Sequence, residues 1–349
     1  MFGARSKECR AAGGDERGER PVLRATVIVN RRARRLVAAG RLLDELCRPR
    51  PGIEIVETSS PEDLDDVARA LAARAGEGSA AEREAVVLAG GDGSYMAGAT
   101  ALARAFGDRP LPALAFAPGG TVGTVARSWG ASGDPVRRAA RLLEAIVRGS
   151  FRSVRRPTLR VAEEGRPPTP GHERIGFIFG AGLVARFFEI YESRGAGGNV
   201  AAARIVARVF AGSFVGSRFA RSVLEPTSCT LRVDGAEAPF DRISLLCASV
   251  VRDLGLGMRL TYRAGEHLDR FHAVATPLGP RALGPQMPLV LAARPLLGPR
   301  IDALAARLEL RFAEGRGAYV LDGDLFRADA IALTPGPAID VIEPGPRVV

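Results

Sequence analysis

The sequence predicts two domains: an α/β domain built on a parallel sheet that is covered on both faces, followed by a domain of antiparallel β-structure. Its length of 349 residues is enough for about two domains. Up to residue 129, strand-like apolar runs alternate four times with helical patterns, which is typical of a parallel sheet. After about Phe151, strand-like runs lie close together between turn residues such as Asp322-Gly323, which favours antiparallel pairing.

The elements of the first half follow in order. Residues 24–30 form a β-rich apolar run, residues 36–47 carry apolar side chains at helical spacing, and residues 53–58 alternate as a strand does. Ser60 and Pro61 start a helix that runs to about Arg74, because serine caps helices and proline favours their first position. Buried strands are expected at 85–89 and 114–117, each followed by a glycine-rich turn and a helix.

The second half is expected to contain many strands and one helical insert. The insert covers about residues 182–222, and the boundary between the domains is placed near 150–157. Residues 1–22 hold little apolar content and are expected to be a disordered tail. The predicted strands are 158–162, 175–180, 229–234, 243–251, 257–262, 271–276, 307–312 and 318–321.

Composition excludes several classes of protein. The net charge is +10, but residues 1–50 hold 13 basic and 6 acidic residues, so the excess is concentrated there. Basic residues interleaved with aromatics are absent, which argues against a nucleic-acid partner. Four separated cysteines and three histidines give no metal motif and favour a reducing cytoplasm. No apolar run reaches the roughly 18 residues that cross a bilayer.

Two glycine-rich turns follow neighbouring strands. The first is Gly90-Gly91-Asp92-Gly93-Ser94, and the second is Pro118-Gly119-Gly120-Thr121. Glycines let the backbone approach a ligand, and amides that precede a helix attract anions. Either turn alone reads equally well as a simple tight turn. Because ligands bind at the carboxyl ends of parallel strands, the pair together favours a nucleotide-phosphate site.

These motifs resemble the catalytic domain of the diacylglycerol kinase family, which includes bacterial lipid kinases and sphingosine kinases. The family pattern is G-G-D-G-T followed by P-x-G-T-x-N-D-x-A-R, against GGDGS and PGGT-x-x-x-x-ARSWG here. Three further matches support it: Asn30 after the first strand, Thr58 after the second, and Asp322-Gly323-Asp324 in place of Asp-Gly-Glu. The resemblance covers about residues 24–345.

The resemblance implies a fold. Residues 23–155 would form a three-layer nucleotide-binding domain similar to phosphofructokinase and NAD kinase, and residues 156–330 a β-sandwich that binds lipid. ATP would lie in the cleft between them. Residues 331–349 would include a C-terminal strand that returns to the first domain.

The resemblance also implies an activity, the transfer of the γ-phosphate of ATP to the hydroxyl of a diacylglycerol-like or sphingoid lipid. Asp92 would coordinate Mg²⁺ or orient the phosphate, and Asp322 or Asp324 would act as general base. From the residues alone, Asp322-Gly323 is a two-residue hairpin turn. A further Mg²⁺ ligand would be Asp269. The nucleotide would be held by Asn30, Thr58, Gly90, Gly91, Asp92, Gly93, Ser94, Gly120 and Thr121.

Several positions depart from the family pattern. Met96 stands where the family has Asn, Gly123 and Thr124 stand for Asn-Asp, and His267-Leu268-Asp269 stands for Asp-Asp-Gly. Each change removes a polar group from the expected cleft. A non-catalytic nucleotide- or lipid-binding relative is therefore the alternative, and a NAD kinase, which shares the G-G-D-G turn, is a third hypothesis.

The expected setting is the cytoplasm, with peripheral contact at the inner membrane. The expected partner is a lipid substrate at the membrane surface, and the sequence leaves a homodimer open. Two apolar segments bear on this setting: residues 287–297, and the aromatic-rich insert that contains Phe187, Phe188 and Phe210. Core packing is the simpler reading of both, and a lipid-tail site is the functional one.

Overall fold

The structure, a computed structural model, describes residues 24–31, 40–76, 84–119, 123–130, 133–164, 172–193, 195 and 198–344. The tail expected at residues 1–22 lies outside these residues. So does the start of the helix expected at 36–47, of which the structure describes α2 (Gly40–Leu46).

The first domain is built on a six-stranded sheet with the order β2-β1-β3-β4-β19-β5. Four neighbouring strands are parallel: β1 (Arg24–Asn30), β2 (Ile53–Thr58), β3 (Glu84–Gly90) and β4 (Ala113–Pro118). Strand β19 (Ile339–Pro344), from the end of the chain, pairs parallel to β4 and antiparallel to β5 (Phe151–Arg156). The first sheet therefore contains both ends of the described chain.

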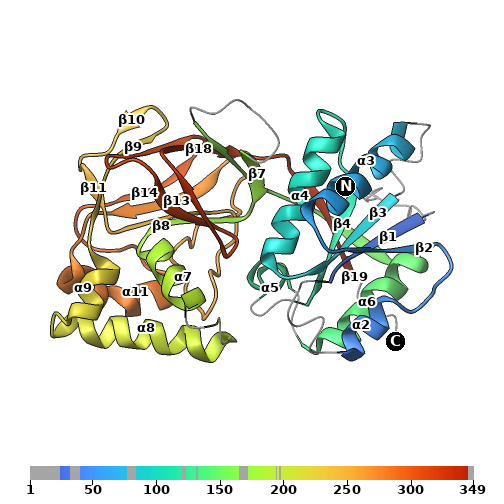
Figure 1. Cartoon of the computed structure of the whole chain (residues 1–349), viewed down its shortest axis with the longest axis horizontal. Helices are drawn as coiled ribbons and strands as arrows, with labels where there is room; N and C mark the ends of the chain where they lie inside the picture. Colours follow the sequence, from blue (N-terminus) through green and yellow to red (C-terminus); the bar gives the residue numbers. More distant parts are fainter. Residues whose placement is uncertain are drawn as a thin grey trace, which may run out of the picture.

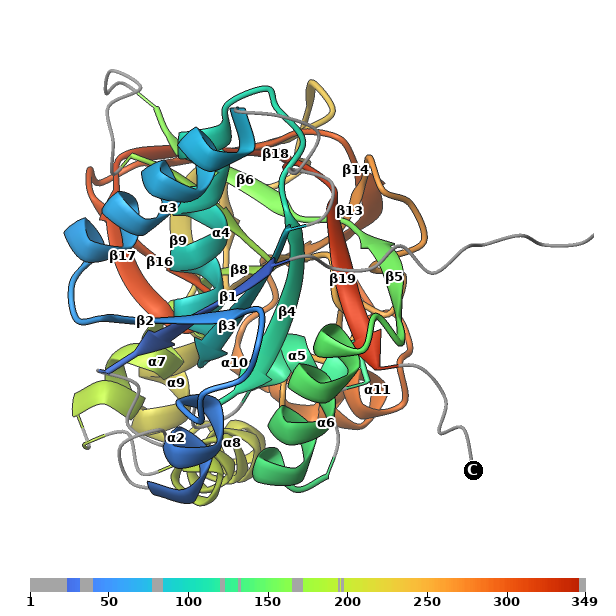
Figure 2. The same cartoon turned by 90° about the vertical axis from the view of Figure 1, so that its right-hand side faces the viewer.

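Helices cover both faces of this sheet (Figure 2). Odd-numbered residues of β1 such as Val27 pack with α2 and α6 (Pro135–Val147). Even-numbered ones such as Ile28 face α3 (Pro61–Gly76) and α4 (Asp92–Phe106). Alternating residues of one strand are thus buried on opposite faces, which is why these strands are almost continuously apolar.

The second domain contains two antiparallel sheets, drawn on the left of Figure 1. One has the order β10-β9-β15-β18-β6-β7, with β11 beside β9, and the other has the order β14-β13-β12-β8-β16-β17. The strands of the first are β6 (Leu159–Glu163), β7 (Glu173–Gly176), β9 (Thr227–Val233), β10 (Ala236–Glu237), β11 (Arg242–Ile243), β15 (Leu308–Phe312) and β18 (Ala330–Pro335). Those of the second are β8 (Ile178–Gly182), β12 (Leu245–Ser249), β13 (Phe271–Thr276), β14 (Ile301–Ala305), β16 (Gly317–Leu321) and β17 (Asp324–Ala328).

Helices lie against the second of these sheets. The insert predicted at 182–222 forms α7 (Leu183–Ser193), α8 (Gly198–Phe214) and α9 (Arg218–Leu224). A second helical segment contains α10 (Pro280–Leu283), a 3₁₀ turn (Gly284–Gln286) and α11 (Met287–Leu291). Among the described residues, no single helix is long and apolar enough to cross a membrane. Helices α8 and α9 pass together by length and composition but are bent by 106° at their junction.

The predicted fold class is confirmed: an α/β domain with a parallel sheet is followed by antiparallel sheets with a helical insert. One expected strand is wrong, because residues 257–262 form turns. Gly257 has a φ of 75°, and Met258 and Leu260 pack into a cavity instead of pairing with a neighbouring strand. Helix α6 and strands β5 and β14 were not expected from the sequence.

The two domains share a core. The rings of Phe116 on β4 and Trp129 after α5 (Thr124–Ser128) meet Phe177, which lies between β7 and β8, at centroid distances of 6.0 and 5.2 Å. Thr100 of α4 adds a polar link, because its Oγ1 accepts a hydrogen bond from the amide of Ile175 at 2.9 Å. These contacts fix α4 and the glycine-rich turn before it against the second domain.

Candidate active site

The two glycine-rich turns begin side by side at the carboxyl ends of β3 and β4. Gly90 is in register with Pro118, and the amide of Gly119 donates a hydrogen bond to the carbonyl of Gly90 at 2.7 Å. Their convergence follows from the parallel pairing of the two strands. Gly120 and Thr121, which were predicted to bind the nucleotide, lie outside the described residues.

Asn30 and Thr58 reach the same edge of the sheet from β1 and β2, where they pair in register. Asn30 Nδ2 donates a hydrogen bond to Ser94 Oγ at 2.8 Å. A Cβ atom on Gly90 would stand 2.4 Å from this Ser94 Oγ, so only glycine leaves room for the contact. Thr58 is buried, and its carbonyl accepts from the amide of Arg31. The structure thus brings Asn30, Thr58, Gly90 and Ser94 together.

Asp92 links the first glycine-rich turn to the start of helix α5. Its Oδ2 accepts from the amide of Thr124 at 2.7 Å and its Oδ1 from the amide of Val125 at 3.1 Å. The carboxylate therefore satisfies the open amides at the start of α5, where negative charge is favoured. Burial raises the pKa of Asp92, while the amide bonds act in the opposite direction.

Asp322 occupies the turn between β16 and β17. Asp322 and Gly323 have φ values of 50° and 94°, as a tight two-residue hairpin turn requires. The Asp322 carboxylate is buried and accepts hydrogen bonds from the amides of Phe177 and Ile178, both at 2.9 Å. Burial, and then the negative charge of Asp92, hold the pKa of Asp322 well above its ordinary range. Asp322 therefore belongs to a hairpin turn and also to an acidic cluster with Asp92 and Asp324.

Asp324, the first residue of β17, lies against the start of α4. A Cβ atom on Gly93 would stand 2.6 Å from Asp324 Oδ2, so the missing side chain makes room for this carboxylate. Asp324 keeps an exposed surface, yet surrounding protein partly desolvates its carboxyl group. This burial, and then the charge of Glu192, raise the pKa of Asp324 to about 6, while Arg174 opposes the shift.

A cavity of about 410 Å³ begins at these aspartates and continues into the second domain. Asp92, Asp322 and Asp324 line one end together with Gly123 and Thr124. The rest is almost entirely apolar and is lined from α7, α8, α11 and the loop at 254–260, by residues such as Phe187, Val209, Phe210, Met258, Met287 and Val290. The volume lies within the roughly 300–1,000 Å³ of small-molecule sites.

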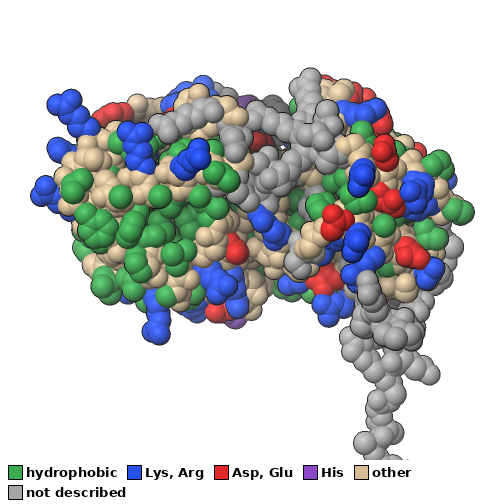
Figure 3. All heavy atoms as spheres, turned by 90° about the horizontal axis from the view of Figure 1, so that it is seen from below, with side chains coloured by type: hydrophobic (Ala, Val, Ile, Leu, Met, Phe, Trp, Pro, Cys, Tyr) green, Lys and Arg blue, Asp and Glu red, His purple; other side chains and the backbone are tan. Residues whose placement is uncertain are grey.

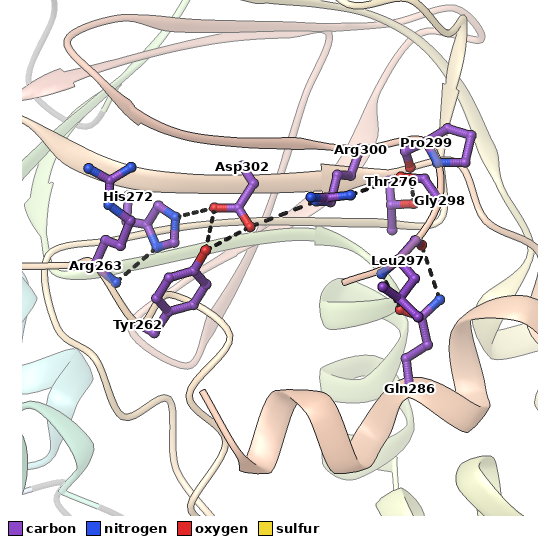
Figure 4. A network of polar contacts seen from close by, with 10 residues as sticks. All are labelled: Tyr262, Arg263, His272, Thr276, Gln286, Leu297, Gly298, Pro299, Arg300 and Asp302. Carbon is purple, nitrogen blue, oxygen red and sulfur yellow. Dashed lines mark hydrogen bonds and ion pairs between the residues drawn. The ribbon is translucent and has the colours of Figure 1, made fainter. Parts of the chain in front are cut away.

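The wall of this cavity is fixed by a polar network (Figure 4). His272 of β13 is fully buried, accepts from the amide of Arg263 through Nδ1 at 3.3 Å, and contacts Asp302 of β14 through Nε2 at 2.8 Å. The Tyr262 hydroxyl donates to the same Asp302 carboxylate at 3.1 Å. The network ties the loop that carries Met258 and Leu260 to the sheet. No motif in the sequence indicates it, because its members come from separate segments.

Asp269, expected to hold a second Mg²⁺, lies apart from this site. It is exposed in the loop before β13. Within the described ranges, no group of three or more His, Cys, Asp or Glu side chains is arranged to hold a metal ion. The structure therefore brings together Asp92, Asp322 and Asp324, but not Asp269.

The positions that depart from the family pattern have different surroundings. Met96 is buried in the core rather than in the cavity. Gly123 caps α5 in the left-handed conformation, with a φ of 59°, which glycine and asparagine tolerate best. Gly123 thus keeps the backbone conformation that Asn can adopt. Gly123 and Thr124 both line the cavity, so its lining lacks the amide and the carboxylate of the family's Asn-Asp.

Comparisons with known proteins bear on the first domain and on the fold. Residues 24–155 match the diacylglycerol kinase catalytic domain, which confirms the resemblance seen in the motifs. No curated protein matches the chain in sequence. The chain is similar to a crystal structure of a diacylglycerol kinase from Bacillus anthracis str. Sterne, with 14% identity, a TM-score of 0.55, and coverage of 94% of this chain and 98% of that one.

Two further solved structures from that organism give the same result. One has 15% identity and a TM-score of 0.60, covering 94% of this chain and 99% of that one. The other has 15% identity and a TM-score of 0.61, covering 91% and 96%. At such identities the likeness establishes the fold, and the family match over residues 24–155 supports a lipid or nucleotide kinase.

Proposed function

Starting from the match of residues 24–155 to the diacylglycerol kinase catalytic domain, we propose that this protein is an ATP-dependent lipid kinase. It transfers the γ-phosphate of ATP to the hydroxyl of a diacylglycerol-like or sphingoid lipid at the cytoplasmic membrane surface. One observation carries the proposal: the cavity has three aspartates at one end and apolar side chains along the rest. This change from an acidic end to an apolar lining suits a lipid that has a hydroxyl group at one end and a hydrocarbon chain beyond it.

The nucleotide phosphates would lie at the edge formed by β1, β2, β3 and β4. The amides of Gly91 and Gly93 at the start of α4, a 15-residue helix, favour anions there. Asn30 and Ser94, already joined by a hydrogen bond, flank the same turn. The phosphates would thereby be held beside Asp92 and within reach of the acidic end of the cavity.

Mg²⁺ fits the residues present. Burial, and then the charges of Asp92 and Asp324, raise the pKa of Asp322, so the three carboxyl groups at this end repel one another when ionised. A divalent cation relieves such repulsion, and Mg²⁺ beside phosphates usually needs only one or two carboxylates. Asp92 is the carboxylate nearest the turns that would hold phosphate. When bound, the ion would neutralise charge on the transferred phosphoryl group.

Asp324 is the residue that would remove the proton of the lipid hydroxyl. The hydroxyl oxygen forms a bond to the γ-phosphorus, the bond from that phosphorus to the bridging oxygen of ADP breaks, and the proton passes to the Asp324 carboxylate. Asp322 is a poorer base, because its oxygens are held by two backbone amides and buried. Asp322 acts instead as a positioning residue that fixes the hairpin carrying Asp324.

The alternative is a non-catalytic nucleotide- or lipid-binding relative. Its support comes from Gly123 and Thr124, which stand for Asn and Asp in the cavity lining, whereas Met96 is buried in the core. Turnover separates the two hypotheses. Purified protein is incubated with γ-labelled ATP, Mg²⁺ and a total lipid extract, then with diacylglycerol, sphingosine or NAD⁺ alone. We expect label in a lipid. Label in NAD⁺ only, or lipid binding without label transfer, would contradict the proposal.

The matched variants are Asp324→Asn and Asp329→Asn. Loss of a general base lowers kcat by about 10²–10⁴-fold, so Asp324→Asn should reduce lipid labelling to that extent while nucleotide binding persists. Asp329 is exposed beyond β17 and should be silent when changed. Equal activity of the two variants would remove Asp324 from the mechanism.

A further inference from the structure

An exposed apolar face covers the outside of the cavity wall. Six of the eight exposed large hydrophobic residues in the described chain lie on α8, on α11 or in the adjoining loops. Figure 3 shows hydrophobic side chains gathered on this underside of the second domain. The six, called the apolar face below, are Val200 (63% exposed), Phe214 (57%), Val215 (75%), Leu256 (37%), Leu291 (49%) and Leu297 (64%).

Positive charge predominates around this face, although Asp253 accepts a hydrogen bond from the amide of Gly255 in the loop of Leu256. The sequence contains no Asp or Glu between Glu192 and Glu225, nor between Asp269 and Asp302, although 39 acidic residues are spread over the whole chain. Exposed arginines lie in these segments and beside Met258: Arg204, Arg208, Arg218, Arg259, Arg281 and Arg294. None of the six takes part in an ion pair with any residue that the structure describes. The apolar face is therefore bordered by uncompensated positive charge.

Leu256, which is 37% exposed, adopts its backbone conformation at an energetic cost. It lies between Gly255 and Gly257 at the tip of a turn closed by a hydrogen bond from the amide of Met258 to the carbonyl of Gly255. Its φ is 53°, a left-handed conformation that costs a non-glycine residue about 1–2 kcal/mol. Leu256 also lines the cavity, so its side chain lies where the apolar face and the cavity meet.

We propose that the apolar face docks this protein onto an anionic lipid bilayer. The apolar side chains enter the region between headgroups and acyl chains, and the arginines contact lipid phosphates. The same elements also line the cavity, at Phe210, Met287 and Val290. The ring of Phe210 contacts that of the exposed Phe214 at a centroid distance of 5.1 Å, so the apolar face is continuous with the cavity lining. A lipid would then pass from the bilayer to the cavity without crossing water. This inference rests on the proposed lipid kinase function and assigns the surface through which the lipid arrives.

A second copy of the chain is the competing occupant, and charge argues against it. In a two-fold symmetric dimer each face meets its own copy, so the arginines of one face would approach those of the other. An anionic membrane offers the opposite charge over the same area. The arrangement of an apolar centre and a basic border therefore fits the bilayer better.

Vesicle sedimentation tests the proposal with the full chain and without ATP. Protein is spun with vesicles of pure phosphatidylcholine or with vesicles that also contain phosphatidylglycerol. We expect binding to the anionic vesicles, weakened by salt. Val215→Ser with Leu297→Ser should lower the partition coefficient at least about tenfold. Arg204→Gln with Arg294→Gln should lower it about 25-fold, at about fivefold for each charge.

The matched control is Leu268→Ser with Arg232→Gln, since both residues are exposed and lie outside the apolar face. It should bind vesicles like the unchanged protein. Equal losses in the control and the test variants would overturn the proposal. So would a dimer in solution that Val215→Ser turns into monomers, together with no vesicle binding, since that assigns the face to a second copy.

A micelle assay separates this proposal from the kinase proposal. With lipid presented in detergent micelles, the apolar-face variants should label lipid as fast as the unchanged protein, because none of the changed residues lines the cavity. Vesicle binding that depends on the face, without any phosphoryl transfer, would refute the kinase function and leave the docking surface standing. Transfer in micelles without vesicle binding would refute the docking surface alone.

Discussion

Three aspartates at one end of the cavity have different surroundings and therefore different chemistry. The carboxylate of Asp92 accepts hydrogen bonds from the amides of Thr124 and Val125. The carboxylate of Asp322 accepts hydrogen bonds from the amides of Phe177 and Ile178. Asp324 has no such backbone bonds in the described chain and takes its raised pKa from partial burial and Glu192. Only the third carboxylate has the freedom that a proton acceptor needs.

The pKa of Asp324 predicts how activity depends on pH. A general base must be ionised, and the pKa of Asp324 is raised to about 6. We therefore expect kcat/KM for the lipid to rise with pH through about 6 and to level off above it. Initial rates measured from pH 5 to 8 at saturating ATP check this. A profile that is flat across this range would show that Asp324 is not the base.

Changing Gly93 to alanine is expected to lower the reaction rate by displacing one carboxylate. In Gly93→Ala the new Cβ would lie 2.6 Å from Asp324 Oδ2, so the carboxylate must move. Since misplacement by about 1 Å can cost about 10²-fold in rate, we expect kcat to fall to that extent, with the midpoint of thermal unfolding unchanged. Gly40→Ala is the control, because its Cβ would meet nothing within 4 Å. Unaltered kcat in Gly93→Ala would contradict the assigned geometry.

At the scale of elements, the first domain is held to the second by helix α4. Its first turn carries Asp92 and Gly93, and its middle carries Thr100, which bonds to β7. Strand β7 is at the edge of its sheet, so the amide of Ile175 would lack a partner without Thr100. One helix thereby sets the distance between the glycine-rich turn and the hairpin with Asp324.

Thr100→Val tests this link. The change keeps the shape of the side chain but leaves the amide of Ile175 unpaired, and a buried unpaired group costs about 1–3 kcal/mol. We expect the free energy of unfolding, measured with denaturant, to fall by that amount. Thr230→Val, at an exposed site on β9, should change it by less than about 0.5 kcal/mol. Equal effects in the two variants would contradict the role of Thr100.

At the scale of the whole molecule, the chain closes its first sheet with its last described strand. Ile339, Val341 and Ile342 of β19 are all buried, at 0%, 3% and 3% exposure. Strand β19 lies between β4 and β5, so these residues complete the middle of the sheet rather than its edge. The first domain therefore depends on residues that follow the entire second domain.

A chain that ends at Ala338 should not fold. Each buried aliphatic side chain contributes about 1.5–3 kcal/mol, so the loss of three approaches the roughly 5–15 kcal/mol that stabilises an ordinary protein. We expect no cooperative thermal transition by circular dichroism. A chain that ends at Pro344 retains β19 and should unfold at the normal temperature. A cooperative transition in the shorter chain would show that the first sheet is stable without β19.

The local sequence was enough for the elements whose signals are local. The apolar runs at β1, β3 and β4, the Ser60-Pro61 helix start and the first glycine-rich turn depend on neighbouring residues, and the structure has them. Helix α6 also has a local signal, since Asp134 caps it and Pro135 occupies its first position. The expected strand at 257–262 failed because its apolar residues face a cavity, which the pattern of a short segment does not reveal.

The sequence by itself determined the class of fold, the parallel pairing that unites the two turns, and the resemblance of its motifs to diacylglycerol kinases. Only the tertiary structure decided which aspartates face one another, that Asp269 lies apart from them, and that a cavity runs from acid to apolar walls. The physical reason is the separation along the sequence over which each kind of interaction acts. Strand, cap and turn signals act over a few residues, whereas Gly93 meets Asp324 across most of the chain, through packing that no short pattern encodes.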